Sequence, residues 1–229
     1  MLRLNHVRLA MVLLGLLFLG LACSDSSEPE AEPESTEKEA AGLAADLVTG
    51  VSVPADCPEV RSTVGVAFDQ ALHDELVAML ERDQAGRTGG SDPEGDPART
   101  ERLREVLAEH GWPGYELVGE DGEDAAWAIA QHADLDLDFQ RCALAHLEAS
   151  VAEEQASPGN LAYLHDRIAV AEGQPQRFGT QLGCDGTEPS PATPLEDPDR
   201  IDGLRAAATL PPWADYLAEF EVICQEPQG

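Results

Sequence analysis

Apolar residues recur every three or four positions along most of the chain, which is the spacing of one face of an α-helix. Leu72, Leu76 and Met79 form part of the first such stripe, together with Phe68 and Leu80. The spacing predicts four successive helices, over residues 64–86, 98–110, 122–134 and 136–155. No run of residues alternates between apolar and polar in the way that predicts a strand.

Helix start and stop residues predict three more helices in the second half of the chain. Ser157 followed by Pro158 is a favourable start, and Gly173 marks the end of the segment NLAYLHDRIAVAE. Two further helices are expected after the pairs Asp197-Pro198 and Pro211-Pro212. The expected fold class is therefore all-α, a single compact multi-helix domain over residues 57–229.

The first 22 residues read as a bacterial secretory signal. Arg3 and Arg8 precede an apolar run over residues 9–22, which is short for a helix that crosses a bilayer. Cys23 follows directly, and GLACS resembles the lipobox of lipoproteins, in which this cysteine is acylated. We therefore expect a lipid-anchored, palmitate-bearing protein of the cell envelope, at either membrane. The alternative is an ordinary cleaved signal with an incidental cysteine.

Residues 23–56 are acidic and poor in large apolar side chains, which predicts a disordered tether. The whole chain has a formal net charge of −30 and its only lysine is Lys38. This charge repels phosphate backbones and anionic headgroups, so nucleic acid is excluded as a partner and membrane contact is expected only through the lipid.

Four cysteines remain after Cys23, and four cysteines allow three disulfide pairings. An exported chain can oxidise them. We favour a bridge between Cys57 and Cys224, which would join the two ends of the domain. Cys142 lies on an apolar stripe, so we also consider that it is a free buried thiol. Cysteine pairs at metal-binding spacing are absent from the sequence, and no metal or cofactor is expected.

Two helical faces combine aromatic and polar residues. Trp127, Gln131 and Asp134 are spaced four and three apart, so they share one face. A second face contains Tyr163 and the neighbouring residues Asp166 and Arg167. These faces predict a polar seam between helices or the wall of a pocket, and the alternative is that Asp166 and Arg167 form a purely structural ion pair.

A loop rich in glutamine, EGQPQRFGTQLG, follows the second of these faces. Buried amides need hydrogen-bond partners, so we expect Gln176 and Gln181 to bond to the backbone or to the Asp166–Arg167 face. The alternative is that some of these amides bind a ligand.

His132 is the candidate general base, with Asp134 or Asp166 orienting it and Arg167 stabilising negative charge, and the alternative is a structural role for His132. His110 ends a predicted helix and suits a structural role. A metal site made of His110, His132 and Asp134 has no supporting motif spacing.

Several motifs together resemble a bacterial family, the domain of unknown function 6624. They extend from about Leu76 to Tyr216, in the order DQAGR, TERLREVLAEHGWP, LVGEDGEDAAWAIAQHAD with FQ, YLHDR with GQPQRFGTQ, and EDPDRIDGLRAAATLPPWADYL. The chain departs from the family pattern at Phe178, His165 and Arg99, where tyrosine, threonine and asparagine are usual. The resemblance implies a common helical fold and a shared polar cluster, and it implies no activity.

Three function classes follow. The first is an envelope binding or interaction module for a small polar ligand, a glycan or a peptide. Its candidate ligand-binding residues have aromatic or hydrogen-bonding side chains, namely Trp112, Trp127, Gln131, Tyr163, Arg167, Gln176 and Gln181. The second is a hydrolase-like enzyme using His132, although no nucleophile elbow or phosphate-binding loop is present. The third is a purely structural envelope protein. We expect the polar residues from Asp83 to Gln181 to converge on one location.

Overall fold

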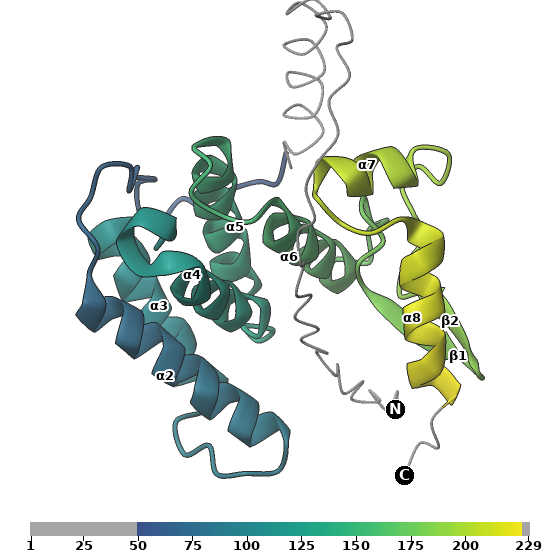
Figure 1. The fold of residues 1–229 in the computed structure, drawn as a ribbon, viewed down its shortest axis with the longest axis horizontal. Coiled ribbons are helices and arrows are strands. Elements are labelled where there is room, and N and C mark those ends of the chain that lie inside the picture. Colours follow the sequence, from purple (N-terminus) through teal and green to yellow (C-terminus); the bar gives the residue numbers. More distant parts are fainter. Residues whose placement is uncertain (1–49, 226–229) are drawn as a thin grey trace, which may run out of the picture.

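The computed structural model describes residues 50–225. These residues form seven helices and a two-stranded sheet (Figure 1). The helices are α2 (Gln70–Arg87), α3 (Gly95–His110), α4 (Tyr115–Gln131), α5 (Leu137–Ala152), α6 (Pro158–Ala171), α7 (Ile201–Ala207) and α8 (Trp213–Gln225). The strands are β1 (Leu182–Asp185) and β2 (Glu188–Pro191). The fold is mostly helical, as the periodicity predicts.

Helix α6 lies between α2–α5 on one side and the C-terminal elements on the other (Figure 1). Its residues Leu161, Leu164 and Ile168 pack into the main core, which α2–α5 complete. Its Ala162 packs instead against Phe178 and the α7 residue Leu204. Helix α6 therefore joins the two parts of the domain through two different faces.

The prediction that the domain contains no strand is wrong. Strands β1 and β2 pair antiparallel between Leu182 and Pro191, and Gly186 has a φ of 65° in the two-residue turn. The signal was Gly186, the first of the two turn residues, where the turns of tight hairpins require a positive φ that glycine adopts readily. Two prolines are tolerated in β2 because both strands of a two-stranded sheet are edge strands.

The first helix begins later than the predicted residue 64. Asp69 caps α2 by accepting the backbone N–H groups of Ala71 and Leu72, at 3.0 Å each. Phe68 precedes this cap and is 50% exposed, so it does not belong to the buried stripe. Helix α4 begins earlier than predicted, at Tyr115, and is kinked at Gly119, whose φ is 76°.

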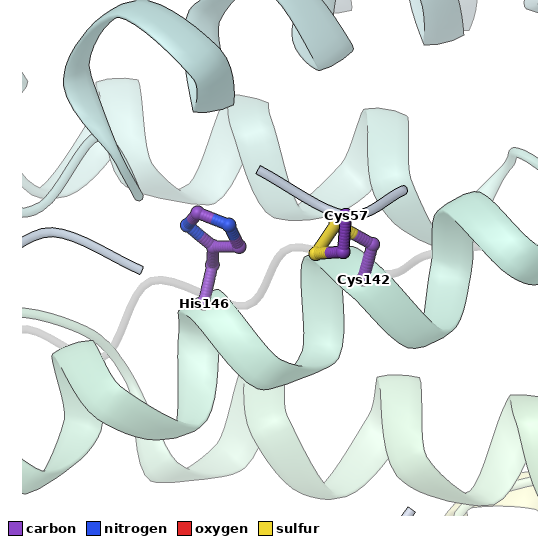
Figure 2. A group of neighbouring side chains, drawn as sticks. All are labelled: Cys57, Cys142 and His146. Atoms are coloured by element: carbon purple, nitrogen blue, oxygen red, sulfur yellow. A yellow bond between two sulfur atoms is a disulfide. The ribbon is translucent and has the colours of Figure 1, made fainter. Parts of the chain in front are cut away.

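The favoured Cys57–Cys224 pairing is wrong, and Cys142 is not a free thiol. The disulfides are Cys57–Cys142 and Cys184–Cys224. The first fastens the segment before α2 onto α5, beside His146 (Figure 2). The second joins β1 to the end of α8, so each disulfide secures one peripheral segment rather than the two ends of the domain.

The signal segment, Cys23 and most of the expected tether lie outside the described residues. Within residues 50–225 no helix is long and apolar enough to cross a membrane. Cys57, the first residue of the expected domain, is covalently attached to the helical core.

Candidate functional site

His132 forms a close pair with a carboxylate from a distant helix. It directly follows α4, and its Nδ1 lies 2.9 Å from Oδ2 of Asp83 in α2. The Asp83 side chain is fully buried and that of His132 is 8% exposed. Arg87, one turn after Asp83 in α2, donates to both oxygens of the carboxylate.

Two arginines keep this carboxylate ionised. Arg87 donates from Nη2 to Asp83 at 2.8 Å, and Nη2 of the buried Arg99 lies 3.4 Å from the same oxygen. Burial alone would raise the pKa of Asp83, but the hydrogen bonds from His132 and Arg87 outweigh it and the pKa lies well below its ordinary value. Asp96 bridges the two arginines on their other side, at 2.9 and 2.7 Å.

The ionised neighbour decides which ring nitrogen of His132 carries the proton. Nδ1 faces the Asp83 carboxylate, so we assign the N–H to Nδ1, which donates to Asp83. The Nε–H of Arg87 also lies 3.2 Å from Nδ1, but it has both Asp83 oxygens as better acceptors at 3.0 and 3.2 Å. Nε2 of His132 is therefore the nitrogen with the free lone pair.

His132 lines a cavity of about 290 Å³ between the first turns of α3 and the junction of α4 with α5. The other lining residues are Asp96, Pro97, Thr100, Glu101, Ala133, Leu135 and Asp136. Three of them are acidic and none is basic. An imidazole oriented by a buried carboxylate at a cavity wall can accept a proton from a molecule bound there.

The expected partners of His132 are wrong. Asp134 is exposed and receives a bidentate pair of hydrogen bonds from Arg167, at 2.7 and 2.6 Å. Asp166 is buried beneath the glutamine loop, and Arg167 does not line the cavity. The partner, Asp83, lies in the DQAGR motif, and its four-residue spacing from Arg87 was the available signal.

A polar seam runs between α4 and α6, as their sequence faces predict. Asn160 donates to the buried Glu123 at 3.0 Å at one end of the seam. One turn further, the rings of Trp127 and Tyr163 meet edge to face with centroids 6.0 Å apart. The Asp134–Arg167 pair follows beyond the end of α4. These contacts succeed one another in the same order on both helices, so α4 and α6 run parallel.

Gln131 lies one turn beyond Trp127 on this face of α4, and its side chain is fully buried. Neither its amide oxygen nor its amide nitrogen has a hydrogen-bond partner within the described residues, and the same holds for the indole N–H of Trp127. Buried polar atoms are nearly always bonded. The middle of the seam is thus a place where polar groups are enclosed without partners.

Asp166 holds the glutamine loop in place, which confirms that the loop packs into the domain. Its carboxylate accepts backbone N–H groups from Arg177, Phe178 and Thr180 at 2.8 to 3.1 Å, and the hydroxyl of Thr180 at 3.2 Å. The alternative of an Asp166–Arg167 ion pair is wrong, because Arg167 pairs with Asp134.

The amide of Gln176 is used by the fold itself. Its nitrogen donates to the carbonyl groups of Gln181 and Thr193, and its oxygen accepts the backbone N–H of Gln181. The Gln181 amide nitrogen donates to Thr180 Oγ1 at 3.1 Å and lies 3.4 Å from the carbonyl oxygen of Tyr163. These bonds close the loop against α6.

A profile of the family described as "Family of unknown function (DUF6624)" matches residues 70–224. The chain belongs to the DUF6624 family. No curated protein and no solved structure gives a significant match. The DUF6624 match covers all the helices α2–α7 and most of α8, and it includes every cluster described above.

Sequence reasoning missed a buried carboxyl in this DUF6624 chain. Glu123 is fully buried and accepts the indole N–H of Trp112 at 3.1 Å and the Asn160 amide. Burial, reinforced by the neighbouring Asp124, raises the pKa of Glu123 to about 8. Trp112 is 1% exposed, so its ring is part of the core and presents no open face for stacking.

Among the described residues, one group of side chains has the spacing of metal ligands, namely Cys57, Cys142 and His146. Figure 2 shows that the two sulfur atoms are joined to each other as a disulfide. The imidazole of His146 is bonded through Nε2 to the carbonyl oxygen of Pro58 at 3.0 Å, and burial lowers its pKa. The disulfide and the His146–Pro58 hydrogen bond therefore attach the segment before α2 to α5.

The polar residues do not converge on one location. In the DUF6624 fold they divide into the His132 cavity, the α4–α6 seam and the Asp166 loop anchor. His110 belongs to none of these, since its side chain is 34% exposed and lies 3.6 Å from Glu109.

Proposed function

We propose that this protein is a lipid-anchored protein of the bacterial cell envelope in which His132 performs general acid–base catalysis. The observation that carries the catalytic part is the His132–Asp83 pair at the wall of the 290 Å³ cavity. A histidine at the protein interior needs no cavity for a structural role, whereas a proton acceptor needs space for the molecule that supplies the proton.

The location is supported by the N-terminal sequence and by the disulfides. The basic start, the short apolar run and Cys23 have the order of a lipoprotein signal. Two disulfides join the four remaining cysteines, and such bonds persist in exported proteins rather than in the bacterial cytosol.

The chemistry is a proton transfer at one atom. Nε2 of His132 takes a proton from a water molecule or from a substrate hydroxyl in the cavity, and the oxygen that has lost it attacks the substrate. The imidazolium formed is stabilised by Asp83, which stays ionised because Arg87 and Arg99 adjoin it. His132 then returns the proton to the leaving group, and the protein is restored to its starting state.

The lining selects the charge of the substrate. The three acidic side chains of the lining are ion-paired, Asp96 with Arg87 and Arg99, and both Glu101 and Asp136 with Arg104. With the buried Asp83, the carboxylates still outnumber these guanidinium groups by four to three, and this negative excess disfavours a phosphate or a carboxylate near His132. We therefore propose a neutral or cationic substrate with an ester, amide or glycosidic bond.

The second candidate function is a binding module without catalysis. Its support is that buried polar atoms of Trp127 and Gln131 have no hydrogen-bond partner among the described residues. These atoms lie in the α4–α6 seam and not in the His132 cavity. The third class, a purely structural protein, is supported by the Asp166 and Gln176 bonds, which serve the loop alone.

The test compares His132→Gln with His110→Gln, since His110 is a partly exposed histidine outside the cavity. Wild type and both variants are assayed with p-nitrophenyl acetate, alanine p-nitroanilide, a neutral p-nitrophenyl glycoside and p-nitrophenyl phosphate. We expect turnover of at least one of the first three, a loss of roughly 10²–10⁴-fold in His132→Gln and no loss in His110→Gln. Absence of turnover with all of them, or equal rates in the two variants, would refute the catalytic proposal.

A further inference from the structure

We propose that the His132 cavity takes a short apolar acyl group and that Leu135 is the residue that selects it. This inference rests on the proposed catalytic function and deepens it, since it narrows the substrate to a neutral carboxylic ester or amide with an aliphatic acyl group. The observation that carries it is the position of Leu135, which lines the cavity while its side chain is 88% exposed.

The turn between α4 and α5 is an unusual place for a leucine. It is closed by a hydrogen bond from the backbone N–H of Asp136 to the carbonyl oxygen of Ala133, at 2.9 Å. Positions of this kind favour glycine, asparagine, aspartate and serine. Among residues 50–225, Leu135 has the most exposed large apolar side chain, and the other exposed ones do not line the His132 cavity.

This turn is held in place on both sides, so Leu135 stays at the rim of the cavity. One carboxylate oxygen of Asp136 accepts the backbone N–H of Phe139 at 3.0 Å and caps α5. The other accepts Nη2 of Arg104 in α3 at 2.6 Å. One short segment therefore presents both the apolar side chain of Leu135 and the Nε2 lone pair of His132 to the same cavity.

The apolar part of the lining distinguishes between the bonds that His132 could break. Pro97 and Ala133 add apolar surface to that of Leu135, and the lining contains no aromatic side chain. A sugar ring against these residues would lose water from its hydroxyl groups without gaining hydrogen bonds, which is unfavourable. An alkyl group in the same position only removes apolar surface from water.

The size of the cavity limits the length of the acyl group. Its volume of about 290 Å³ is close to the lower limit for small-molecule pockets, which is about 300 Å³. We therefore expect a short chain that lies on Leu135, and not a long lipid chain.

The reaction is the hydrolysis of an acyl bond. Nε2 of His132 takes a proton from a water molecule, whose oxygen forms a bond to the acyl carbon. The bond from this carbon to the alcohol or amine then breaks with its electron pair, and Nε2 returns the proton to that leaving group. The acid product ionises at neutral pH, and the negative excess around the cavity favours its release.

The first test is the dependence of kcat/KM on acyl length, with p-nitrophenyl acetate, butyrate, hexanoate and decanoate. A fully buried CH₂ group corresponds to about fourfold, so two such groups at an open rim should make wild type prefer butyrate to acetate by about 3–15-fold. Hexanoate should be preferred to decanoate.

The variant is Leu135→Asn, which keeps the approximate size of the side chain and suits a turn. We expect it to reduce the butyrate-to-acetate ratio to about one. Val222→Asn is the matched control, because it removes an exposed apolar side chain of α8 that does not line the cavity, and it should keep the ratio of wild type.

Binding of methyl butyl ketone, which has no leaving group, gives a second measurement that needs no turnover. The ring proton signals of His132 in the NMR spectrum, assigned by their loss in His132→Gln, should shift in a saturable way. We expect Leu135→Asn to weaken this binding by about fivefold or more.

The inference is overturned if Leu135→Asn keeps the selectivity of wild type, if the neutral glycoside is the preferred substrate, or if the ketone fails to bind or binds wild type and Leu135→Asn equally. Ketone binding that depends on Leu135, without turnover of any ester or amide, would refute catalysis by His132 and leave the apolar acyl site in place. Failure of the two proposals is therefore recognised separately.

Discussion

The buried carboxyl of Glu123 makes the stability of this protein depend on pH in an identifiable way. The side chain is fully buried in the core, and its pKa is raised to about 8 from an ordinary value of 4.5. The unfolded chain ionises this group near its ordinary pKa, whereas the folded protein keeps it neutral. Its contribution to stability is therefore complete below about pH 4.5 and is lost as the pH rises through about 8.

The size of the effect follows from the difference between the two pKa values. Each pKa unit corresponds to about 1.4 kcal/mol, so ionising Glu123 in the folded state costs on the order of 4–5 kcal/mol. Glu123→Gln cannot ionise. Its amide nitrogen would face the donor of Trp112 or Asn160, so we expect the variant to be about 1–3 kcal/mol less stable than wild type at pH 5.

The measurement is urea unfolding of wild type and Glu123→Gln at several values between pH 5 and 9.5. We expect the wild type to lose several kcal/mol relative to the variant over this range, so that the variant becomes the more stable of the two at high pH. Glu120→Gln removes the same charge from an exposed position of the same helix and serves as the control. A stability difference between wild type and Glu123→Gln that stays constant with pH would refute the reasoning.

Three further predictions concern the loop anchor, a disulfide and a glycine. Asp166→Asn should lower the free energy of unfolding by about 2–4 kcal/mol, measured in urea, because the carboxylate accepts several backbone N–H groups; an unchanged midpoint would contradict this. Replacing Cys57 and Cys142 by serine should lower the free energy of unfolding by about 2–5 kcal/mol in the same assay, and wild type treated with reductant should lose at least as much, because reduction also opens Cys184–Cys224. Gly179→Ala should lower the free energy of unfolding by about 1–3 kcal/mol, measured by thermal melting, because φ is 65° and the new Cβ would lie 2.7 Å from the Trp213 ring. An unaltered melting temperature would show that the loop adjusts freely.

Periodicity predicts helices α2–α5 because each of them buries an apolar face in the main core. The Ser157-Pro158 start of α6 is found where it was predicted, since both residues act locally at the helix end. The beginning of α2 was misplaced because Phe68 has the spacing of the stripe but lies outside the Asp69 cap. A local pattern cannot show which member of an apolar series is left in solvent.

Local sequence patterns cannot predict which residues far apart in the chain bond to one another. Cys57 bonds with Cys142 across 85 positions, and the sequence permits two other partners for it. The pairing depends on how the segment before α2 crosses α5, which no local feature records. The partner of His132 was missed for the same reason, because Asp134 and Asp166 were nearer in sequence than Asp83.

The expectation of one polar cluster failed because of helix geometry at the end of α4. Successive residues of an α-helix point about 100° apart, so Gln131 and His132 face different neighbours although they are adjacent in the chain. Gln131 belongs to the face that meets α6, and His132 lies against Asp83 in α2. One short motif, AQHAD, therefore contributes to two separate regions: its second residue, Gln131, is buried on the side of α6, and its third, His132, lines the cavity.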